Sequence, residues 1–276
     1  MQPVTILAVN DQTPTGQTSL EPFLNLAIEA ARAAGAIQLR NLGTDLKIDQ
    51  KSNDSDLVTR TDKECEAIIR KMILEAFAGH AILGEEGGME GSSRHVWIVD
   101  PLDGTVNYAH GFPFFCVSIG LEIDGVPSLG VVFDPNRNEL FTATLGGGAL
   151  MNDKPIRVSS QAALTGRAML ATGFPYDTDT ALIAVEVFKR FLAKGLPIRR
   201  PGAAALDLCY VACGRLDGFW EYKLQAWDCA AGNLIIAEAG GKVSDFSGAP
   251  YRYEARKIVA SNGLLHQEML ETIGAV

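Results

Sequence analysis

Acidic residues stand at the places where apolar strand patterns end or helical patterns begin. Carboxylates fixed at the ends of such elements can converge on one edge of a sheet, where they repel each other unless cations lie between them. Hard divalent ions such as Mg²⁺ prefer oxygen ligands of this kind. The arrangement therefore predicts a sheet edge that binds metal ions. The residues concerned are Asp62, Glu85, Asp100 with Asp103, and Asp228.

Segment 97–105 is the most informative of these places. An apolar strand pattern ends at Asp100, Pro101 forces a turn, and Asp103 comes back within reach of the same ion. The backbone carbonyl oxygen of Leu102 can point toward that ion as well. This segment alone offers three oxygen ligands.

Gly104 and Thr105 continue the same segment as a tight turn that opens a short helix. Their backbone N–H groups would make an anion site. An Asp-Gly turn by itself is usually only a polar turn. Metal ligands and a phosphate cradle in one short string instead indicate phosphate chemistry.

The other acidic positions carry less weight individually. Glu85 is followed by Glu86 and could belong to a solvated loop, and either Asp62 or Thr61 could simply cap a helix. Asp228 could be a helix N-cap or a metal ligand. These positions indicate a metal site only when they are considered together with Asp100 and Asp103.

Helical and strand patterns alternate along the chain, which predicts an α/β fold (α+β in layers). We expect helices from residue 21, capped by Ser19, to about 41, over about 62–78 with Gly79 as the stop, and over 180–193, 203–213 and 228–239. Strands at 81–83 and 96–99 precede an antiparallel meander at 115–123, 130–133 and 139–144, with a hairpin at Asp124-Gly125. Later strands are expected at 216–222, 242–244 and 257–260.

One catalytic unit of residues 19–276 fits the length of 276 residues. Within it, residues 19–153 would form the metal- and phosphate-binding half with the antiparallel sheet. Residues 154–276 would form an α/β half that binds substrate. Residues 1–18 are predicted to be a flexible tail.

The composition limits which binding partners and which cellular compartment are expected for this chain. A formal net charge of −9 without a dense basic run argues against nucleic acid or an acidic membrane as a partner. No apolar run is long enough to span a membrane, and the start lacks a signal-peptide pattern, so the cytoplasm is expected. Five cysteines without a C-x-x-C pair indicate reduced core thiols.

Four ordered motifs resemble those of the inositol monophosphatase family, and segment 172–177 resembles its bacterial members more than its animal ones. Residues 100–108 resemble its D-P-[IL]-D-G-T-x-N-[FY] motif, and residues 227–232 its W-D-x-A-[AG]-G motif. Residues 84–86 match its G-E-E, and residues 56–62 its D-L-V-T-x-x-D. Four motifs in order are a specific signal. Loop 47–55 departs from the family by lacking the usual proline.

The resemblance implies an αβαβα sandwich of the sugar-phosphatase type, a homodimer, inhibition by Li⁺, and Mg²⁺-dependent hydrolysis of a small phosphate monoester, myo-inositol 1-phosphate above all. Metal-activated water would attack the phosphate, with two to three Mg²⁺ bound. Glu85, Thr105 and Asp62 would be catalytic, and Gly104 and Thr105 would bind phosphate. The implied metal ligands are Glu85, Asp100, the Leu102 carbonyl, Asp103, Asp228 and, through water, Asp62. The implied substrate-binding residues are Asp103, Gly202, Ala203, Ala204, Glu221 and Asp228, with Lys51 on a loop near the metals.

Three rival functions stay open at this point. A sister phosphatase could act on fructose 1,6-bisphosphate, histidinol phosphate or 3′-phosphoadenosine 5′-phosphate; a second phosphate would call for basic residues such as Arg199 and Arg200. An aspartyl-phosphate phosphatase would need D-x-D spacing, but Asp100 and Asp103 are three apart. A non-catalytic binding module would be expected to have lost a ligand or Thr105, and none is replaced.

Overall fold

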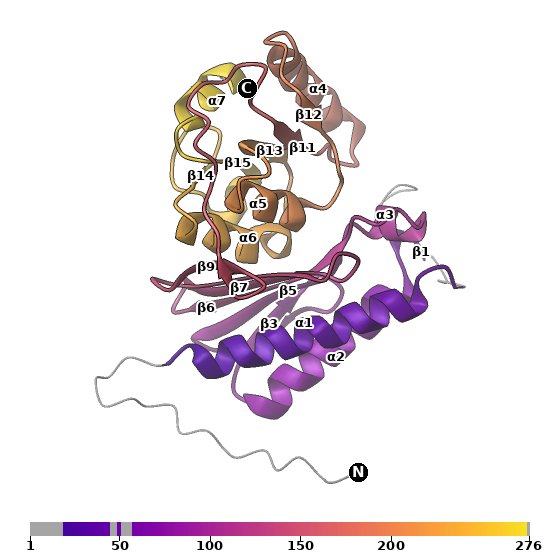
Figure 1. Cartoon of the computed structure of the whole chain (residues 1–276). Coiled ribbons are helices and arrows are strands. Elements are labelled where there is room, and N and C mark those ends of the chain that lie inside the picture. The colour runs from indigo at the N-terminus through magenta and orange to yellow at the C-terminus, as the bar shows by residue number, and fades with distance from the viewer. Residues whose placement is uncertain (1–18, 45–48, 51–56, 275–276) are drawn as a thin grey trace.

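Five layers of helices and sheets make up this computed structural model, which describes residues 19–44, 49–50 and 57–274 (Figure 1). Two helices cover the outer face of an eight-stranded sheet, and two more lie between that sheet and a five-stranded one. Two further helices cover the far side of the second sheet. The predicted αβαβα sandwich is therefore confirmed.

The first layer consists of α1 (Glu21–Asn41) and α2 (Arg60–Ala76). Both helices were expected, but their caps differ from the prediction. Leu20 rather than Ser19 is the N-cap of α1, and the α2 helix ends at Ala76, ahead of Gly79. The N-cap of α2 is Thr59, and Asp62 sits three residues later, where its carboxylate accepts the Thr59 backbone N–H as the second half of a capping box.

The eight-stranded sheet has the order β10-β9-β8-β7-β6-β5-β3-β4, and every pair is antiparallel except β3 with β5. The predicted hairpin joins β6 to β7 through Asp124 and Gly125, whose φ angles of 54° and 74° suit a two-residue turn. The sheet runs two residues past position 153, because β10 pairs with β9. Its strands are β3 (Ala81–Gly84), β4 (Gly88–Glu90), β5 (His95–Asp103), β6 (Cys116–Ile123), β7 (Val126–Asp134), β8 (Glu139–Thr144), β9 (Gly148–Met151) and β10 (Lys154–Pro155).

Three short elements complete the first half of the chain. The strands β1 (Asp49–Gln50) and β2 (Leu57–Val58) pair with each other, and the helix α3 (Thr105–Ala109) follows β5. Lys51 lies outside the described residues.

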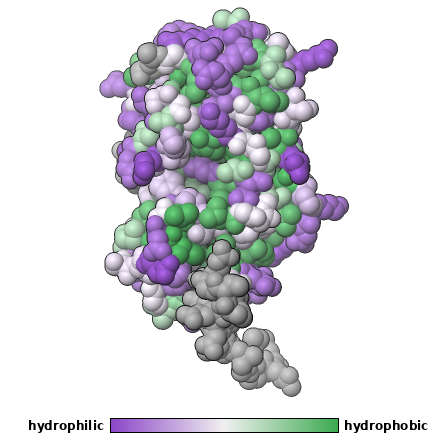
Figure 2. Space-filling view, turned by 90° about the vertical axis from the view of Figure 1, so that its left-hand side faces the viewer, coloured by the Kyte–Doolittle hydropathy of each residue, from purple (hydrophilic) through white to green (hydrophobic). Residues whose placement is uncertain are grey.

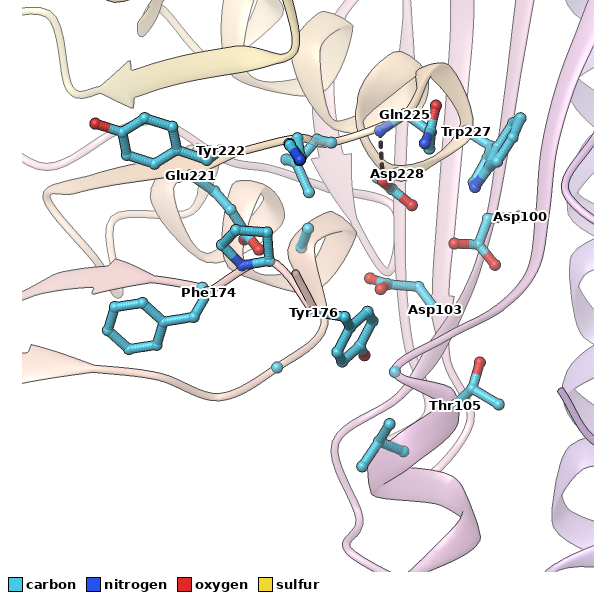
Figure 3. A pocket seen from close by; sticks show the side chains of 18 of the residues that line it. Asp100, Asp103, Thr105, Phe174, Tyr176, Glu221, Tyr222, Gln225, Trp227 and Asp228 are labelled. Atoms are coloured by element: carbon cyan, nitrogen blue, oxygen red, sulfur yellow. Dashed lines mark hydrogen bonds between the residues drawn. The ribbon is translucent and has the colours of Figure 1, made fainter. Parts of the chain in front are cut away.

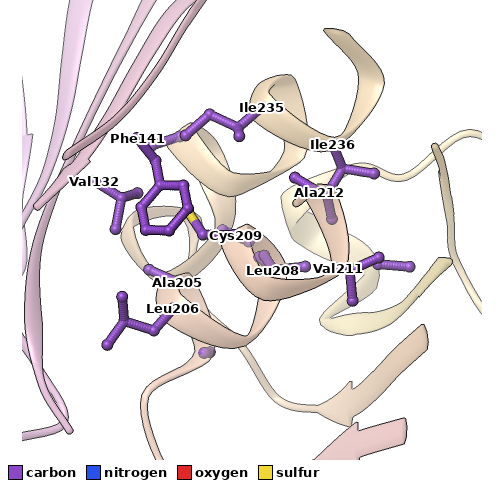
Figure 4. Packing of buried hydrophobic residues seen from close by; sticks show 14 of the residues in the cluster. Val132, Phe141, Ala205, Leu206, Leu208, Cys209, Val211, Ala212, Ile235 and Ile236 are labelled. Atoms are coloured by element: carbon purple, nitrogen blue, oxygen red, sulfur yellow. The ribbon is translucent and has the colours of Figure 1, made fainter. Parts of the chain in front are cut away.

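The middle layer is the core of the molecule. Helices α5 (Ala204–Ala212) and α6 (Ala226–Glu238) carry few polar residues on any face, as expected of helices enclosed on all sides. Figure 4 shows Leu206 and Cys209 of α5 and Ile235 of α6 packed against Val132 and Phe141 of the sheet. This packing holds α5 and α6 against the eight-stranded sheet.

The second sheet has the order β12-β11-β13-β15-β14 and mixes parallel and antiparallel pairs. Outside it lie α4 and α7, whose apolar faces form a separate core with the sheet around Phe191 and Trp220. The elements are β11 (Leu170–Thr172), α4 (Thr178–Leu192), β12 (Ile198–Arg199), β13 (Gly218–Tyr222), β14 (Lys242–Ser244), a 3₁₀ turn (Tyr253–Ala255), β15 (Lys257–Ser261) and α7 (His266–Ile273).

The cysteines agree with the prediction that they are thiols of the core. All five cysteines are free, and only Cys213 among them is partly exposed. Within the described residues, no helix combines the length and the apolar character needed to cross a membrane. Hydrophilic and hydrophobic residues alternate over the face that Figure 2 shows.

Glycines on the sheet let α6 approach closely. A Cβ atom on Gly130 would stand 2.6 Å from the carbonyl oxygen of Ala231, and one on Gly120 would stand 3.0 Å from the Cβ of Ala230. Both contacts are with α6, so the helix rests on a strip of the sheet that has no side chains.

We expect Gly130→Ala to lower the free energy of unfolding by about 1–3 kcal/mol, because the added methyl group overpacks this contact. Chemical denaturation measures the change. Gly79→Ala is the control, since its Cβ would meet nothing within 4 Å. Equal stability of the two variants would contradict the close seating of α6.

Candidate active site

Six carboxylates line one cavity of about 470 Å³, and four of them were singled out from the sequence as metal ligands. Glu85 follows β3, Asp100 and Asp103 belong to β5, and Asp228 lies in the first turn of α6. In Figure 3 the side chains of Asp100, Asp103 and Asp228 point toward one another from the strand and the helix. The structure thus brings four of the five acidic residues that the sequence singled out to one cavity, from both halves of the chain, whereas Asp62 is not among the residues that line it.

A β-bulge brings Asp100 and Asp103 to the same side of β5. Residues three apart on a regular strand face opposite sides of the sheet. Here Asp100 pairs with Ser118 and Asp103 with Cys116, so three steps along β5 match two along β6. The strand therefore continues through Asp103, and the turn predicted at Pro101 is wrong. The bulge accommodates one extra residue within the strand instead.

Hydrogen bonds hold both aspartates in place. The Asp100 carboxylate accepts the backbone N–H of Leu102 at 2.9 Å, and the Asp103 carboxylate accepts that of Ala205 at 2.7 Å. Asp228 accepts the N–H of Gln225 at 2.6 Å. Gln225 is the N-cap of α6, so Asp228 is its third residue and not the N-cap that was one of two sequence interpretations.

Burial and mutual repulsion disfavour negative charge at these groups. Burial, followed by the charges of Glu85, Asp103 and Asp228, holds the pKa of Asp100 well above its usual range. Burial and the charge of Asp228 raise the pKa of Asp103 to about 7, against the opposing hydrogen bond from Ala205. A divalent cation among these carboxylates would reverse the effect, because it favours their charged forms.

The donor set fits a hard divalent ion. In the stretches that the structure describes, no three His, Cys, Asp or Glu side chains are drawn tightly around one point. The same cavity is nevertheless lined by six carboxylates, among them Glu85, Asp100, Asp103 and Asp228, and by Leu102, whose carbonyl supplies a further oxygen. Because like charges repel, an ion among these oxygens would draw the side chains inward.

Thr105 lies at the edge of this carboxylate group. Its hydroxyl is 3.1 Å from a carboxylate oxygen of Asp62 and 3.0 Å from the carbonyl oxygen of Leu102. The other Asp62 oxygen accepts the N–H and the hydroxyl of Thr59, which fixes the carboxylate. Gly104, with φ of 91°, precedes α3, and a Cβ there would stand 2.9 Å from the carbonyl oxygen of Phe114. Only glycine suits that position.

The expected polyol-binding residues occupy another part of the same cavity. Glu221 of β13, Gly202 and Ala204 line it, whereas Ala203 is the buried N-cap of α5 and does not. Burial, then the charges of Asp228 and Asp103, raise the pKa of Glu221 to about 8.

Sequence reasoning missed three features of this region. Lys223 and Arg256 line the cavity beside Arg200, and Asp207 is buried behind it with one carboxylate oxygen that has no hydrogen-bond partner among the described residues. Lys223 could have been noticed from its place two residues after Glu221. Nothing in the sequence around Arg256 indicated a role.

A buried glutamate holds the turn that presents Glu85. The Glu66 side chain accepts the backbone N–H groups of Glu86 and Gly87, each at 2.7 Å, and the Nε–H of Arg70 at 2.8 Å. A Cβ on Gly87 would stand 2.7 Å from Glu66 and Arg70 atoms, which explains the glycine. This turn is therefore fixed from α2.

We expect Glu66→Gln to lower the free energy of unfolding by about 3 kcal/mol, because an amide NH₂ would face backbone donors. It should also raise the Mg²⁺ concentration needed for half-maximal activity several-fold, since Glu85 would be held less firmly. Glu75→Gln on the same helix is the control, as its pair with Lys71 is exposed. An unchanged metal requirement would show that the contact is structural only.

Comparison with known proteins agrees with this site. The model of the inositol monophosphatase family matches residues 19–276. An inositol-1-monophosphatase of Synechocystis is 43% identical, covering 94% of this chain and 91% of that protein. The Nus factor SuhB of Pseudomonas aeruginosa is 44% identical, covering 92% and 96%. Among solved structures, SuhB of Bartonella henselae superposes with a TM-score of 0.88 at 39% identity, covering 91% and 98%.

The fold and the carboxylate-lined cavity, together with these matches, define a phosphoric monoester hydrolase of a metal-dependent class. The chain belongs to the inositol monophosphatase family.

Proposed function

We propose that this protein hydrolyses myo-inositol 1-phosphate to inositol and phosphate with two to three Mg²⁺ ions. The observation that carries the proposal is the convergence of four carboxylates on one cavity, those of Glu85, Asp100, Asp103 and Asp228. Burial raises the pKa values of Asp100 and Asp103, as expected of carboxylates that lack a cation. The name of the Synechocystis relative supports the substrate.

In this proposal those four carboxylates and the Leu102 carbonyl would hold the ions. When bound, Mg²⁺ neutralises the phosphate, lowers the pKa of water and stabilises the leaving oxygen. Thr105 would orient the attacking water, because its hydroxyl can donate to Asp62 and accept from water. The Gly104 and Thr105 backbone N–H groups would bind phosphate oxygens, and Glu85 would help to position the water.

Recognition of the polyol would fall to residues near β13. Glu221 would bind a ring hydroxyl, and its raised pKa lets the carboxyl group donate as well as accept near neutral pH. Asp103 and Asp228 would contact substrate beside the metals. Gly202 and Ala204 leave room for the ring, since neither has a large side chain, whereas Ala203 does not line the cavity. Lys51 and the metal contact of Asp62 through water stay proposals from the family resemblance.

Phosphate release with and without Mg²⁺ tests the function. The panel is inositol 1-phosphate, fructose 1,6-bisphosphate, histidinol phosphate and 3′-phosphoadenosine 5′-phosphate. We expect Mg²⁺-dependent release from inositol 1-phosphate, and reduced selectivity among sugar phosphates in Glu221→Gln. Release that does not need a divalent ion would refute the mechanism, and no release from inositol 1-phosphate would refute the substrate.

We also propose a cytoplasmic homodimer that is inhibited by Li⁺. Two apolar side chains of α4, Leu182 and Leu192, are 62% and 54% exposed and lie about 80° apart around the helix, which supports an interface on that side. Light scattering after size-exclusion chromatography should give twice the chain mass. A purely monomeric protein, or full activity at high lithium, would contradict these proposals.

A further inference from the structure

One uncharged side chain joins the proposed phosphate-binding turn to the wall of the polyol pocket. Asn107 belongs to α3, which continues from the turn at Gly104 and Thr105, and it lines the catalytic cavity. We propose that Asn107 is a positioning residue that holds the turn at Pro201 and Gly202 at the distance from the phosphate that a polyol ring requires. The inference rests on the proposed function, because it assigns Gly202 to the wall around the ring.

The amide nitrogen of Asn107 lies against three backbone carbonyl oxygens. It is 2.8 Å from that of Phe114, 2.9 Å from that of Pro201 and 3.3 Å from that of Gly202. The amide has two N–H groups, so it can donate to the first half of the chain and to the second half at the same time. Pro201 stands 94 residues after Asn107, so this contact joins segments that are distant in the sequence.

The glycines on both sides show how closely these segments approach. Gly202 has a φ of 89°, and a Cβ atom there would stand 3.2 Å from the amide nitrogen of Asn107. Glycine therefore adopts the left-handed conformation without cost and leaves room for the amide. A Cβ on Gly104 would stand 3.3 Å from that of Ala203, so the phosphate-binding turn and the pocket wall are also in direct contact. A displacement of one segment would be transmitted to the other.

A second hydrogen bond between the same segments lies at the proposed metal site. The Asp103 carboxylate accepts the backbone N–H of Ala205 at 2.7 Å. Because Asp103 is also a proposed metal ligand, that bond cannot be removed without altering the metal site. Asn107 is neutral and is not among the proposed ligands. Loss of its amide should therefore weaken recognition of the ring and spare the binding of phosphate.

The test uses two Asn107 variants that differ in what they keep. Asn107→Leu has the same branching and removes the donor and the acceptor, whereas Asn107→Asp keeps an acceptor oxygen and loses only the donor. The measured quantity is the Ki for inorganic phosphate divided by the KM for the ester, both in Mg²⁺. This ratio reports what the ring adds to the binding of phosphate, and a general change in charge or metal affinity cancels in it. The ester is inositol 1-phosphate or, where the wild type prefers another compound of the panel, that compound.

Both variants should lower the ratio about tenfold, which corresponds to about 1.4 kcal/mol, and should change kcat for the ester at most threefold. A fall in Asn107→Leu alone would mean that the side-chain oxygen contacts the substrate directly, and it would overturn the positioning role. A ratio that stays at the wild-type value in both variants would overturn it as well.

Asn262→Asp is the matched control. Asn262 is not among the residues that line the cavity, and its amide nitrogen is 2.8 Å from the Gln161 carbonyl oxygen and 3.0 Å from the Ser159 hydroxyl oxygen. Its side-chain oxygen accepts two backbone N–H groups, which an aspartate would retain. The variant thus loses the same kind of donor from another link between segments. It should lose stability and keep the ratio, and an equal fall in the ratio would assign the effect to stability and overturn the proposal.

Hydrogen exchange of the metal-free protein gives a readout that does not need turnover. In Asn107→Leu the backbone N–H groups of segment 202–207 should exchange faster than in the wild type, and those of β6 should not change. This result would support the positioning role even if no ester of the panel is hydrolysed, an outcome that would refute the proposed function alone. Equal exchange of segment 202–207 in the variant and the wild type would overturn the positioning role, even where Mg²⁺-dependent release from inositol 1-phosphate upholds the proposed function.

Discussion

Asp100→Asn should reduce turnover at least a thousandfold, which corresponds to about 4 kcal/mol of transition-state stabilisation. The carboxylate points into the cavity with one oxygen held by the Leu102 N–H, so the amide would keep the fold and lose the charge that an ion needs. In EDTA the variant should be no less stable than the wild type, because burial already disfavours the Asp100 charge. Added Mg²⁺ should stabilise only the wild type, by about 2.7 kcal/mol at a hundred times the Kd.

Asp217→Asn is the control for a buried aspartate away from the cavity. Asp217 accepts the N–H of Met169 at 2.7 Å and the hydroxyl of Ser159 at 2.5 Å, so its role is to join segments of the second half. This variant should lose about 1–3 kcal/mol of stability and retain turnover. Normal turnover in Asp100→Asn, measured as Mg²⁺-dependent phosphate release, would remove Asp100 from the metal site.

Without metal, the protein should lose stability as the pH rises from 6.5 to about 8.5. Asp103 and Glu221 have pKa values near 7 and 8 in the folded protein, whereas both ionise near pH 4 once unfolded. Over this window the folded protein releases protons that the unfolded chain has already lost. Their stabilising contribution is complete below pH 4 and is lost as the pH passes 7–8. Within the window from pH 6.5 to 8.5 the loss is on the order of 3 kcal/mol.

Thermal unfolding in EDTA and in saturating Mg²⁺ measures this effect. The window starts at pH 6.5 because His266, whose pKa burial lowers to about 4, changes stability in the opposite sense below that pH. In Mg²⁺ the decline should disappear, since ions bind the deprotonated carboxylates more tightly as the pH rises. A double variant, Asp103→Asn with Glu221→Gln, should flatten the EDTA curve. A wild-type curve that is already flat would contradict the raised pKa values.

Periodicity predicted the large elements well, because apolar spacing follows directly from which face is buried. The meander and both middle helices lie within a few residues of their expected bounds. The predicted N-cap of α2 was wrong, because several polar residues near the start of that helix could accept the same backbone N–H groups. Thr59 and Asp62 have the Thr-x-x-Asp spacing of a capping box, a signal that was present and that Thr61 obscured.

The carboxylate cluster was predictable because each acid follows a recognisable strand or opens a helix. The bulge between Asp100 and Asp103 was not, since its position depends on the register with β6. The cationic side of the cavity was missed for a similar reason. Arg256 reaches it through a left-handed backbone and a bond to Lys223, a pairing between distant segments that no local pattern contains.

Seating of α6 on the glycine strip also has a consequence for biosynthesis. The ribosome completes the eight-stranded sheet, with Glu85, Asp100 and Asp103, before it makes Asp228. At about 5–20 residues per second, the gap lasts on the order of ten seconds. During that time the nascent chain has an acidic edge without its fourth carboxylate. In the proposed metal site, high-affinity uptake of the ion would therefore wait for α6, and it would be a late step in maturation that reports the folding of both halves.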